Sequence, residues 1–282
     1  MIVSAYAKLN LSLGVHTRAG EALHGIVGMF QSIDWFDSVD ISTADEDQLA
    51  GPDGSSVIDG TMNLAWRAVN AVRSHAGTST AVRLLLDKRL PVAAGLGGGS
   101  ADAAAALGGA GRIFDVGHEG LQDIAPTLGS DVPFCFVGGR AVVKGTGEEV
   151  SSLRPAAGYS VAIVVPPVEL ATAAVYAAWD RLDGPSGPEV NGRALPPSLR
   201  DDGPFVNDLY AAAVAVAPSI DDWRSELANR WRRPVMLTGS GPALFAYFVD
   251  GDEASSAIQD VPIGARAAEV AAPVDYGWQV RR

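Results

Sequence analysis

The chain has 282 residues, of which 48% are apolar, 19% charged and 7% aromatic, a composition that indicates one or two globular domains and excludes a disordered protein. Its 21 basic and 33 acidic residues give a net charge of −12, which argues against a general nucleic-acid-binding protein but allows anion binding through local donors. The single cysteine, Cys135, excludes an intramolecular disulfide and a zinc site built from several cysteines.

The first half of the chain carries strand and helix patterns in turn. Apolar residues alternate over 1–15, which predicts a strand, and residues 100–107 form an alanine-rich run without glycine or proline, which predicts a helix. The other elements expected here are strands at 35–43 and 80–86, a helix at 63–75 that Gly77 ends, and a β-hairpin over 133–150 that turns at Gly138-Gly139.

The second half begins with a β-branched run. The elements expected here are a strand at 159–165, a helix at 172–182, a loop rich in proline and glycine at 184–203, helices at 205–217 and 219–232, and strands at 235–238 and 243–249. We place a domain boundary near residue 155 and predict an α+β fold with two lobes, residues 1–155 and 156–282.

No stretch approaches the about 18 consecutive apolar residues of a membrane span. Lys8 interrupts the first apolar stretch, so the start of the chain lacks the pattern of a secretory signal. We therefore expect a cytoplasmic protein that binds neither membranes nor nucleic acid.

The most informative segment is a glycine-rich loop that runs directly into the alanine-rich helix. Four of the five residues 95–99 are glycine, which lets a ligand approach the backbone closely. The helix that follows offers unpaired N–H groups and the positive end of its dipole to an anion, and Ser100 could cap this helix or contact a phosphate or a metal ion. The other interpretation is a flexible turn with a serine cap. The spacing fits neither a Walker A motif nor a Rossmann fingerprint, because the lysine of the first and the third glycine of the second are missing.

The string Pro-x3-Gly-Leu-Gly-Gly-Gly-Ser-Ala from Pro91 to Ala101 resembles the second motif of the GHMP kinases. Ala-Lys-Leu-Asn-Leu-Ser-Leu at 7–13 resembles their first motif, and Leu-Thr-Gly-Ser-Gly-Pro-Ala at 237–243 resembles their third. This resemblance implies a two-lobed kinase with an N-terminal ATP-binding lobe and a C-terminal substrate lobe, which uses ATP as its Mg²⁺ complex. It assigns ATP binding to Pro91, Gly95, Leu96, Gly97, Gly98, Gly99, Ser100 and Ala101.

Within this superfamily the chain is most similar to the kinases of 4-diphosphocytidyl-2-C-methyl-D-erythritol, which act in the non-mevalonate isoprenoid pathway. Gly-Ser-Asp-Val-Pro-Phe at 129–134 resembles their catalytic motif, which makes Asp131 the base that accepts the hydroxyl proton and Lys8 its charge partner. For the acceptor the resemblance implies Asn10 as a hydrogen-bonding residue, His24 at the edge of the cytosine base, and Tyr176 as an aromatic stacking partner. Leu23 stands where the family has a second stacking tyrosine, so it offers apolar cover without a π-face.

Two other functions remain open at this stage. Leu23 favours a GHMP kinase that acts on a different small alcohol. A non-catalytic nucleotide-binding paralogue is the second alternative, and the retention of both Lys8 and Asp131 argues against it. Asn207 either caps a helix or belongs to the site. Oligomeric state and metal ligands do not follow from the sequence.

Overall fold

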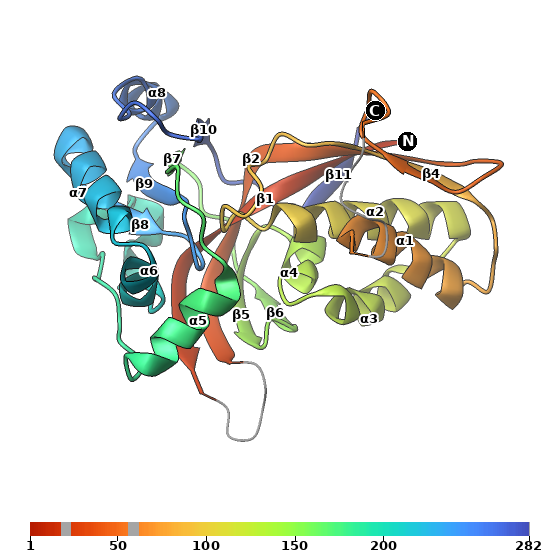
Figure 1. Cartoon of the computed structure of the whole chain (residues 1–282), viewed down its shortest axis with the longest axis horizontal. Coiled ribbons are helices and arrows are strands. Elements are labelled where there is room, and N and C mark those ends of the chain that lie inside the picture. Colours follow the sequence, from red (N-terminus) through yellow and green to blue (C-terminus); the bar gives the residue numbers. More distant parts are fainter. Residues whose placement is uncertain (18–23, 56–61, 282) are drawn as a thin grey trace.

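The computed structural model describes residues 1–17, 24–55 and 62–281. In these residues the strands form a seven-stranded sheet with the order β11-β1-β2-β4-β3, in which β5 pairs with β2 and β6, and a four-stranded sheet with the order β10-β7-β9-β8 (Figure 1). The strands are β1 (Ile2–His16), β2 (Gly25–Thr43), β3 (Gln48–Ala50), β4 (Val82–Asp87), β5 (Arg140–Gly145), β6 (Glu149–Ser152), β7 (Ser160–Val165), β8 (Met236–Leu237), β9 (Leu244–Phe248), β10 (Ala267–Ala271) and β11 (Trp278–Val280).

Helices cover both sheets. They are α1 (Leu64–His75), α2 (Gly98–Phe114), α3 (His118–Leu128), α4 (Val132–Val137), α5 (Thr172–Arg181), α6 (Tyr210–Val216), α7 (Ser219–Trp231) and α8 (Gly251–Gln259). Helices α1 to α4 gather beside the larger sheet, and α5 to α8 gather around the smaller one (Figure 1). This arrangement is the two-lobed α+β fold that the sequence predicts.

Strand β1 is the structural link between the lobes. It pairs with β2 along nearly its whole length, and the register shifts between Tyr6 and Ala7 and again between Asn10 and Ser12. Between these irregularities, Leu9 packs in a core cluster that it shares with the smaller sheet, whereas Val3 and Leu13 outside them pack in the larger core. The irregularities therefore let one strand supply two cores.

Helix α2 passes through Gly108, Gly109 and Gly111, beyond the residue at which we expected it to end. A Cβ atom at Gly108 would lie 2.5 Å from the ring of Trp278, and one at Gly109 would lie 2.7 Å from Ile41 Cγ2. These glycines let the helix lie close against the larger sheet, so tertiary packing outweighs their low helix propensity.

Two predicted elements are wrong. Residues 132–137 form the short helix α4 and not the first strand of a hairpin, and the hairpin consists of β5 and β6 and turns after Gly145. Helix α4 is buried on nearly all sides, so its apolar run had no periodicity that could distinguish a helix from a strand. The helix expected over 205–217 begins only at Tyr210, because residues 205–207 make bridges to Val190 and Leu13.

The predicted loop 184–203 contains two short 3₁₀ helices, η1 (Gly192–Ala194) and η2 (Pro197–Asp202). Helices α3 and α8 and strands β10 and β11 had no predicted counterpart. Strand β11 belongs to the second half of the chain but pairs with β1 in the larger sheet. The division into lobes at residue 155 remains a prediction.

Candidate functional site

Lys8 and Asp131 form an ion pair between β1 and the start of α4. Lys8 Nζ lies 3.3 Å from Asp131 Oδ2, and the lysine side chain is 5% exposed while the aspartate side chain is 32% exposed. Asp131 is the N-cap residue of α4 but makes no capping hydrogen bond with its side chain. Its carboxylate is therefore directed to a buried ammonium group and remains accessible from solvent, as a proton acceptor for an external hydroxyl requires.

Asn10 lies beside this pair, two residues along β1. Its Oδ1 accepts hydrogen bonds from Lys8 Nζ at 2.7 Å and from the Thr238 hydroxyl at 3.3 Å. Its backbone N–H donates to Thr238 Oγ1 at 2.9 Å. Asn10 and Thr238 are both buried, so this network fixes the direction of the Lys8 side chain.

The loop 239–242 meets the same residues from the smaller sheet. Asn207 is buried, and its Nδ2 donates to the carbonyl oxygens of Leu237 and Gly239 at 2.8 Å each. Its Oδ1 accepts the N–H of Leu209 at 3.0 Å, so Asn207 supports both the turn before α6 and this loop. Sequence reasoning left Asn207 open and missed Thr238, although Thr238 directly precedes the glycines of the third motif.

The glycine-rich loop packs on both of these segments. Lys8 N–H donates to the Leu96 carbonyl at 3.0 Å, and a Cβ atom at Gly95 would lie 2.6 Å from the Thr238 carbonyl oxygen. Gly97 has a φ of +72°, and a Cβ atom there would lie 2.9 Å from Lys8 Cγ. The three sequence motifs thus meet at one place in the fold.

Helix α2 begins at this meeting point. Gly97 is its N-cap residue, and its first hydrogen bond runs from Ala101 N–H to the Gly97 carbonyl at 2.8 Å. The N–H groups of Gly98, Gly99 and Ser100 therefore have no partner within the helix and, with the helix dipole, form an anion site. Ser100 is the third residue of the helix and so cannot be its cap, which corrects one of the two roles expected for it.

A buried charge cluster lies under this helix terminus and was not predicted. Lys88 Nζ donates to the carboxylates of Asp37 and Asp102, at 2.5 Å for Asp102, and Asp37 is completely buried. Desolvation raises the pKa of Asp102 to about 7; the positive charge of Lys88 opposes this shift and the negative charge of Asp37 adds to it. Among the described residues, Asp102 Oδ1 has no hydrogen-bond partner.

His24 and Tyr176, both predicted for the acceptor, lie together between the start of β2 and α5. Their ring centroids are 5.0 Å apart, and His24 Nε2 lies 2.7 Å from Asp180 Oδ1. Burial raises the pKa of Tyr176 to about 12, and the negative charge of Asp131 adds to this shift, so the ring lies within electrostatic range of the ion pair. Leu23 lies outside the described residues.

The single cysteine of the chain is a core residue. Cys135 is buried, and desolvation raises the pKa of its thiol, as expected for a small apolar core residue.

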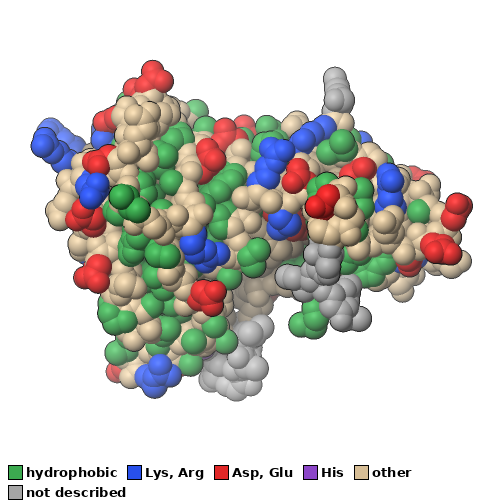
Figure 2. Space-filling view, turned by 45° about the horizontal axis from the view of Figure 1, so that its top comes forward, with side chains coloured by type: hydrophobic (Ala, Val, Ile, Leu, Met, Phe, Trp, Pro, Cys, Tyr) green, Lys and Arg blue, Asp and Glu red, His purple; other side chains and the backbone are tan. Residues whose placement is uncertain are grey.

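Within residues 1–17, 24–55 and 62–281 no group of three or more His, Cys, Asp or Glu side chains is placed to hold a metal ion. No helix in these ranges is long and apolar enough to cross a membrane. Figure 2 shows acidic and basic side chains interspersed over one face of the molecule.

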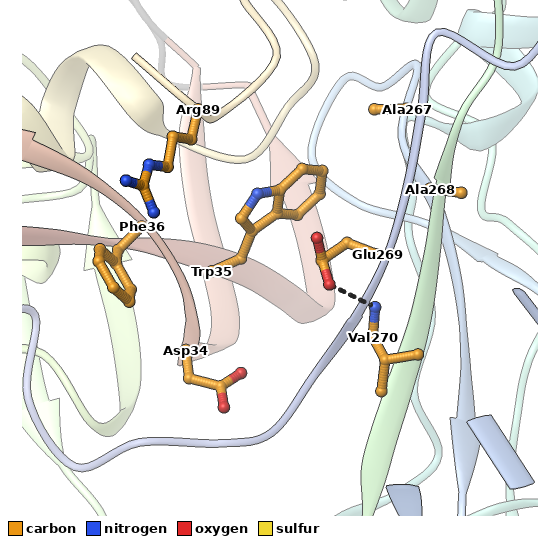
Figure 3. A pocket seen from close by; sticks show the side chains of 8 residues that line it. All are labelled: Asp34, Trp35, Phe36, Arg89, Ala267, Ala268, Glu269 and Val270. Carbon is orange, nitrogen blue, oxygen red and sulfur yellow. Dashed lines mark hydrogen bonds between the residues drawn. The ribbon is translucent and has the colours of Figure 1, made fainter. Parts of the chain in front are cut away.

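A separate groove of about 460 Å³ lies between β2 and β10 (Figure 3). Its lining residues are Asp34, Trp35, Phe36, Arg89, Ala267, Ala268, Glu269 and Val270. None of the residues predicted for the site lines this groove. The contacts among the three motifs, rather than the size of a hollow, therefore locate the candidate active site.

Comparisons with known proteins agree with these motifs. Residues 63–139 match the family described as GHMP kinases N terminal domain. The chain is 37% identical over 263 residues to 4-diphosphocytidyl-2-C-methyl-D-erythritol kinase of Moorella thermoacetica, covering 90% of this chain and 92% of the relative. It is 33% identical over 268 residues to the protein of the same name from Geobacter metallireducens, covering 93% and 94%. A crystal structure of 4-(cytidine 5'-diphospho)-2C-methyl-D-erythritol kinase matches with a TM-score of 0.79 at 30% identity, covering 96% of this chain and 99% of that one. The similarity therefore includes both sheets and is not confined to the glycine-rich loop.

Proposed function

This chain belongs to the 4-diphosphocytidyl-2-C-methyl-D-erythritol kinases, a family of GHMP kinases, and on that premise we propose that it is the ATP-dependent kinase of this acceptor. The reaction transfers the γ-phosphoryl group of ATP to the 2-hydroxyl of 4-diphosphocytidyl-2-C-methyl-D-erythritol, a step in the non-mevalonate synthesis of isoprenoid precursors. An enzyme that draws on ATP and a soluble metabolite is expected to work in the cytoplasm.

The observation that carries this proposal is the Lys8–Asp131 ion pair beside the free N-terminus of α2. Asp131 accepts the proton of the acceptor hydroxyl. At the same time the hydroxyl oxygen of the acceptor bonds to the γ-phosphorus, and the bond from that phosphorus to the ADP oxygen breaks. Lys8 orients the Asp131 carboxylate through their ion pair, and the position of Lys8 is itself fixed by Asn10. Both residues thus serve the same proton transfer.

The nucleotide phosphates are assigned to the loop 95–99 and to the start of α2. The unpaired N–H groups of Gly98, Gly99 and Ser100 are donors for phosphate oxygens, and Gly95 and Gly97 leave the space that side chains would fill. ATP is expected as its Mg²⁺ complex, since Mg²⁺ in kinases is commonly held by phosphates and one or two protein oxygens. The Ser100 hydroxyl and the Asp131 carboxylate would hold this Mg²⁺ together with the phosphates, whose charge it would neutralise.

An assay of ATP consumption against a panel of alcohols tests this function. The panel contains the diphosphocytidyl acceptor, homoserine, mevalonate and galactose, each with and without Mg²⁺. We expect turnover with the diphosphocytidyl acceptor only. Turnover with another alcohol would favour a GHMP kinase of different specificity. A folded protein that binds ATP but does not consume it with any of these acceptors would favour a non-catalytic paralogue.

A further inference from the structure

One face of α5 holds a single histidine from the other lobe. Tyr176, Trp179 and Asp180 have the spacing i, i+3 and i+4, which places them on the same side of the helix. His24 packs against all three: its ring centroid lies 5.0 Å from that of Tyr176 and 5.6 Å from that of Trp179, and its Nε2 lies 2.7 Å from Asp180 Oδ1. The imidazole is therefore fixed by two rings and one carboxylate.

The carboxylate decides which ring nitrogen carries the proton. An ionised carboxylate only accepts hydrogen bonds, so Nε2 of His24 must be the donor in this contact. In the neutral imidazole the other nitrogen, Nδ1, then has the lone pair and is an acceptor. A ligand that meets His24 at Nδ1 is thus required to bring an N–H group.

We propose that Asp180 is a positioning residue for acceptor recognition: it fixes His24 so that Nδ1 accepts a hydrogen bond from the 4-amino group of a cytosine base. This inference rests on the proposed function. Uracil has an oxygen in place of that amino group, so it would bring a second acceptor to Nδ1. The pair His24–Asp180 is therefore assigned to discrimination between cytosine and uracil.

Two observations support a role in binding over a role in stability. Burial raises the pKa of Tyr176, which packs on His24, and the negative charge of Asp131 adds to this shift, so the cluster lies within electrostatic range of the ion pair. The Asp180 side chain is 47% exposed, and ion pairs exposed to solvent contribute little to folding stability. Removing Asp180 should therefore change the choice of ligand far more than the melting temperature.

The test compares Asp180→Ala with Asp180→Asn, which keeps an oxygen that can accept the proton of Nε2. Arg181→Ala on the same helix is the matched control, because Arg181 is exposed. For Asp180→Ala we expect KM for the cytidine acceptor to rise about 10-fold, and the preference over the uridine analogue to fall by a similar factor. KM for ATP and the melting temperature should stay as in the wild type, and Asp180→Asn should recover most of the loss.

A second measurement does not depend on turnover. Nitrogen-15 NMR of the four histidines in the chain distinguishes the two neutral tautomers of each ring. In the wild type the His24 signals should show a proton on Nε2, and in Asp180→Ala they should show a mixture of tautomers. An unchanged tautomer together with an unchanged KM would overturn the role of Asp180. A wild-type protein that ignores the cytidine acceptor would instead contradict the proposed function, and the NMR result would still decide what Asp180 does to His24.

Discussion

The substitution Gly97→Ala tests whether the glycine-rich loop and the ion pair depend on each other. Gly97 has a φ of +72°, and a Cβ atom there would lie 2.9 Å from Lys8 Cγ and 3.1 Å from Lys8 Cε. A left-handed conformation costs a residue other than glycine about 1–2 kcal/mol. The Lys8 side chain must also shift, and with it the ammonium group that lies 3.3 Å from Asp131 Oδ2.

The expected effects follow from these two terms. The backbone term alone should lower the free energy of unfolding by about 1–2 kcal/mol and Tm by about 2–6 °C. An ordinary contact begins at 3.4 Å, so Lys8 must move by about 0.5 Å. A displacement of about 1 Å costs roughly 10²-fold in rate, so kcat should fall by about one order of magnitude. Urea titration and steady-state kinetics with both substrates measure the two effects separately.

Gly98→Ala is the matched control. Gly98 does not have a positive φ. The atom nearest to a Cβ added at Gly98 would be Leu90 Cβ at 3.4 Å, which is an ordinary contact. This variant should be as stable as the wild type, and any loss should be confined to KM for ATP, because the added methyl group stands where phosphates approach. Wild-type stability and kcat in Gly97→Ala would refute the coupling between Gly97 and Lys8.

Three further predictions concern the reacting pair, the acceptor and the buried charge cluster. Asp131→Asn should lower kcat by about 10²–10⁴-fold with the protein still folded, and the loss should be strongly non-additive with Lys8→Met in single-turnover assays; near-normal turnover would show that another group is the base. In calorimetric titrations, Tyr176→Ala should weaken binding of the diphosphocytidyl acceptor by about 2- to 13-fold and Leu23→Tyr should strengthen it. The affinity for ATP should be unchanged in both variants. If both variants bind the acceptor as tightly as the wild type, the base does not stack at these positions. Burial raises the pKa of Asp102 from 3.8 to about 7, so between these pH values the folded protein binds a proton that the unfolded chain does not. The free energy of unfolding should therefore fall as the pH rises from about 4 to 7. Urea titrations should show this fall in the wild type and not in Asp102→Asn, and parallel pH profiles of the two proteins would contradict the prediction.

Local patterns in the sequence predicted much of the fold. The alternation in β1 and the helical spacing in α1, α5 and α7 each lie within one element, so neighbouring residues carry the signal. The apolar run of α4 carried none, because burial on all sides removes the contrast between faces. The register shifts of β1 left the alternation of apolar residues uninterrupted, so the sequence could not show that the strand changes core.

The candidate site divides in the same way. The glycine-rich loop and its helix are contiguous, and resemblance to a family of kinases was enough to single out Lys8 and Asp131. The contacts that hold these groups in place join distant parts of the chain, such as Asn207 with Gly239 and His24 with Asp180. No single-sequence pattern reports contacts of this kind, so His24 and Asn207 could be singled out from the sequence but their partners were found only in the folded structure.

The return of β11 to the larger sheet affects how the chain folds during synthesis. Val3 pairs with Val280, and the segment just before β11 passes so close to the end of α4 that a Cβ atom at Gly138 would lie 1.8 Å from Gly277 N. At 5–20 residues per second, the ribosome needs roughly 13–53 s from the end of β1 at His16 to the end of its last partner strand at Val280. During that interval the edge of β1 at Val3, Ser4 and Ala5 lacks its partner strand, and unpaired edges of this kind are where foreign strands can pair. The strand that carries Lys8 is thus completed at Val3, Ser4 and Ala5 only when translation has passed Val280, long after the rest of the larger sheet has been synthesised.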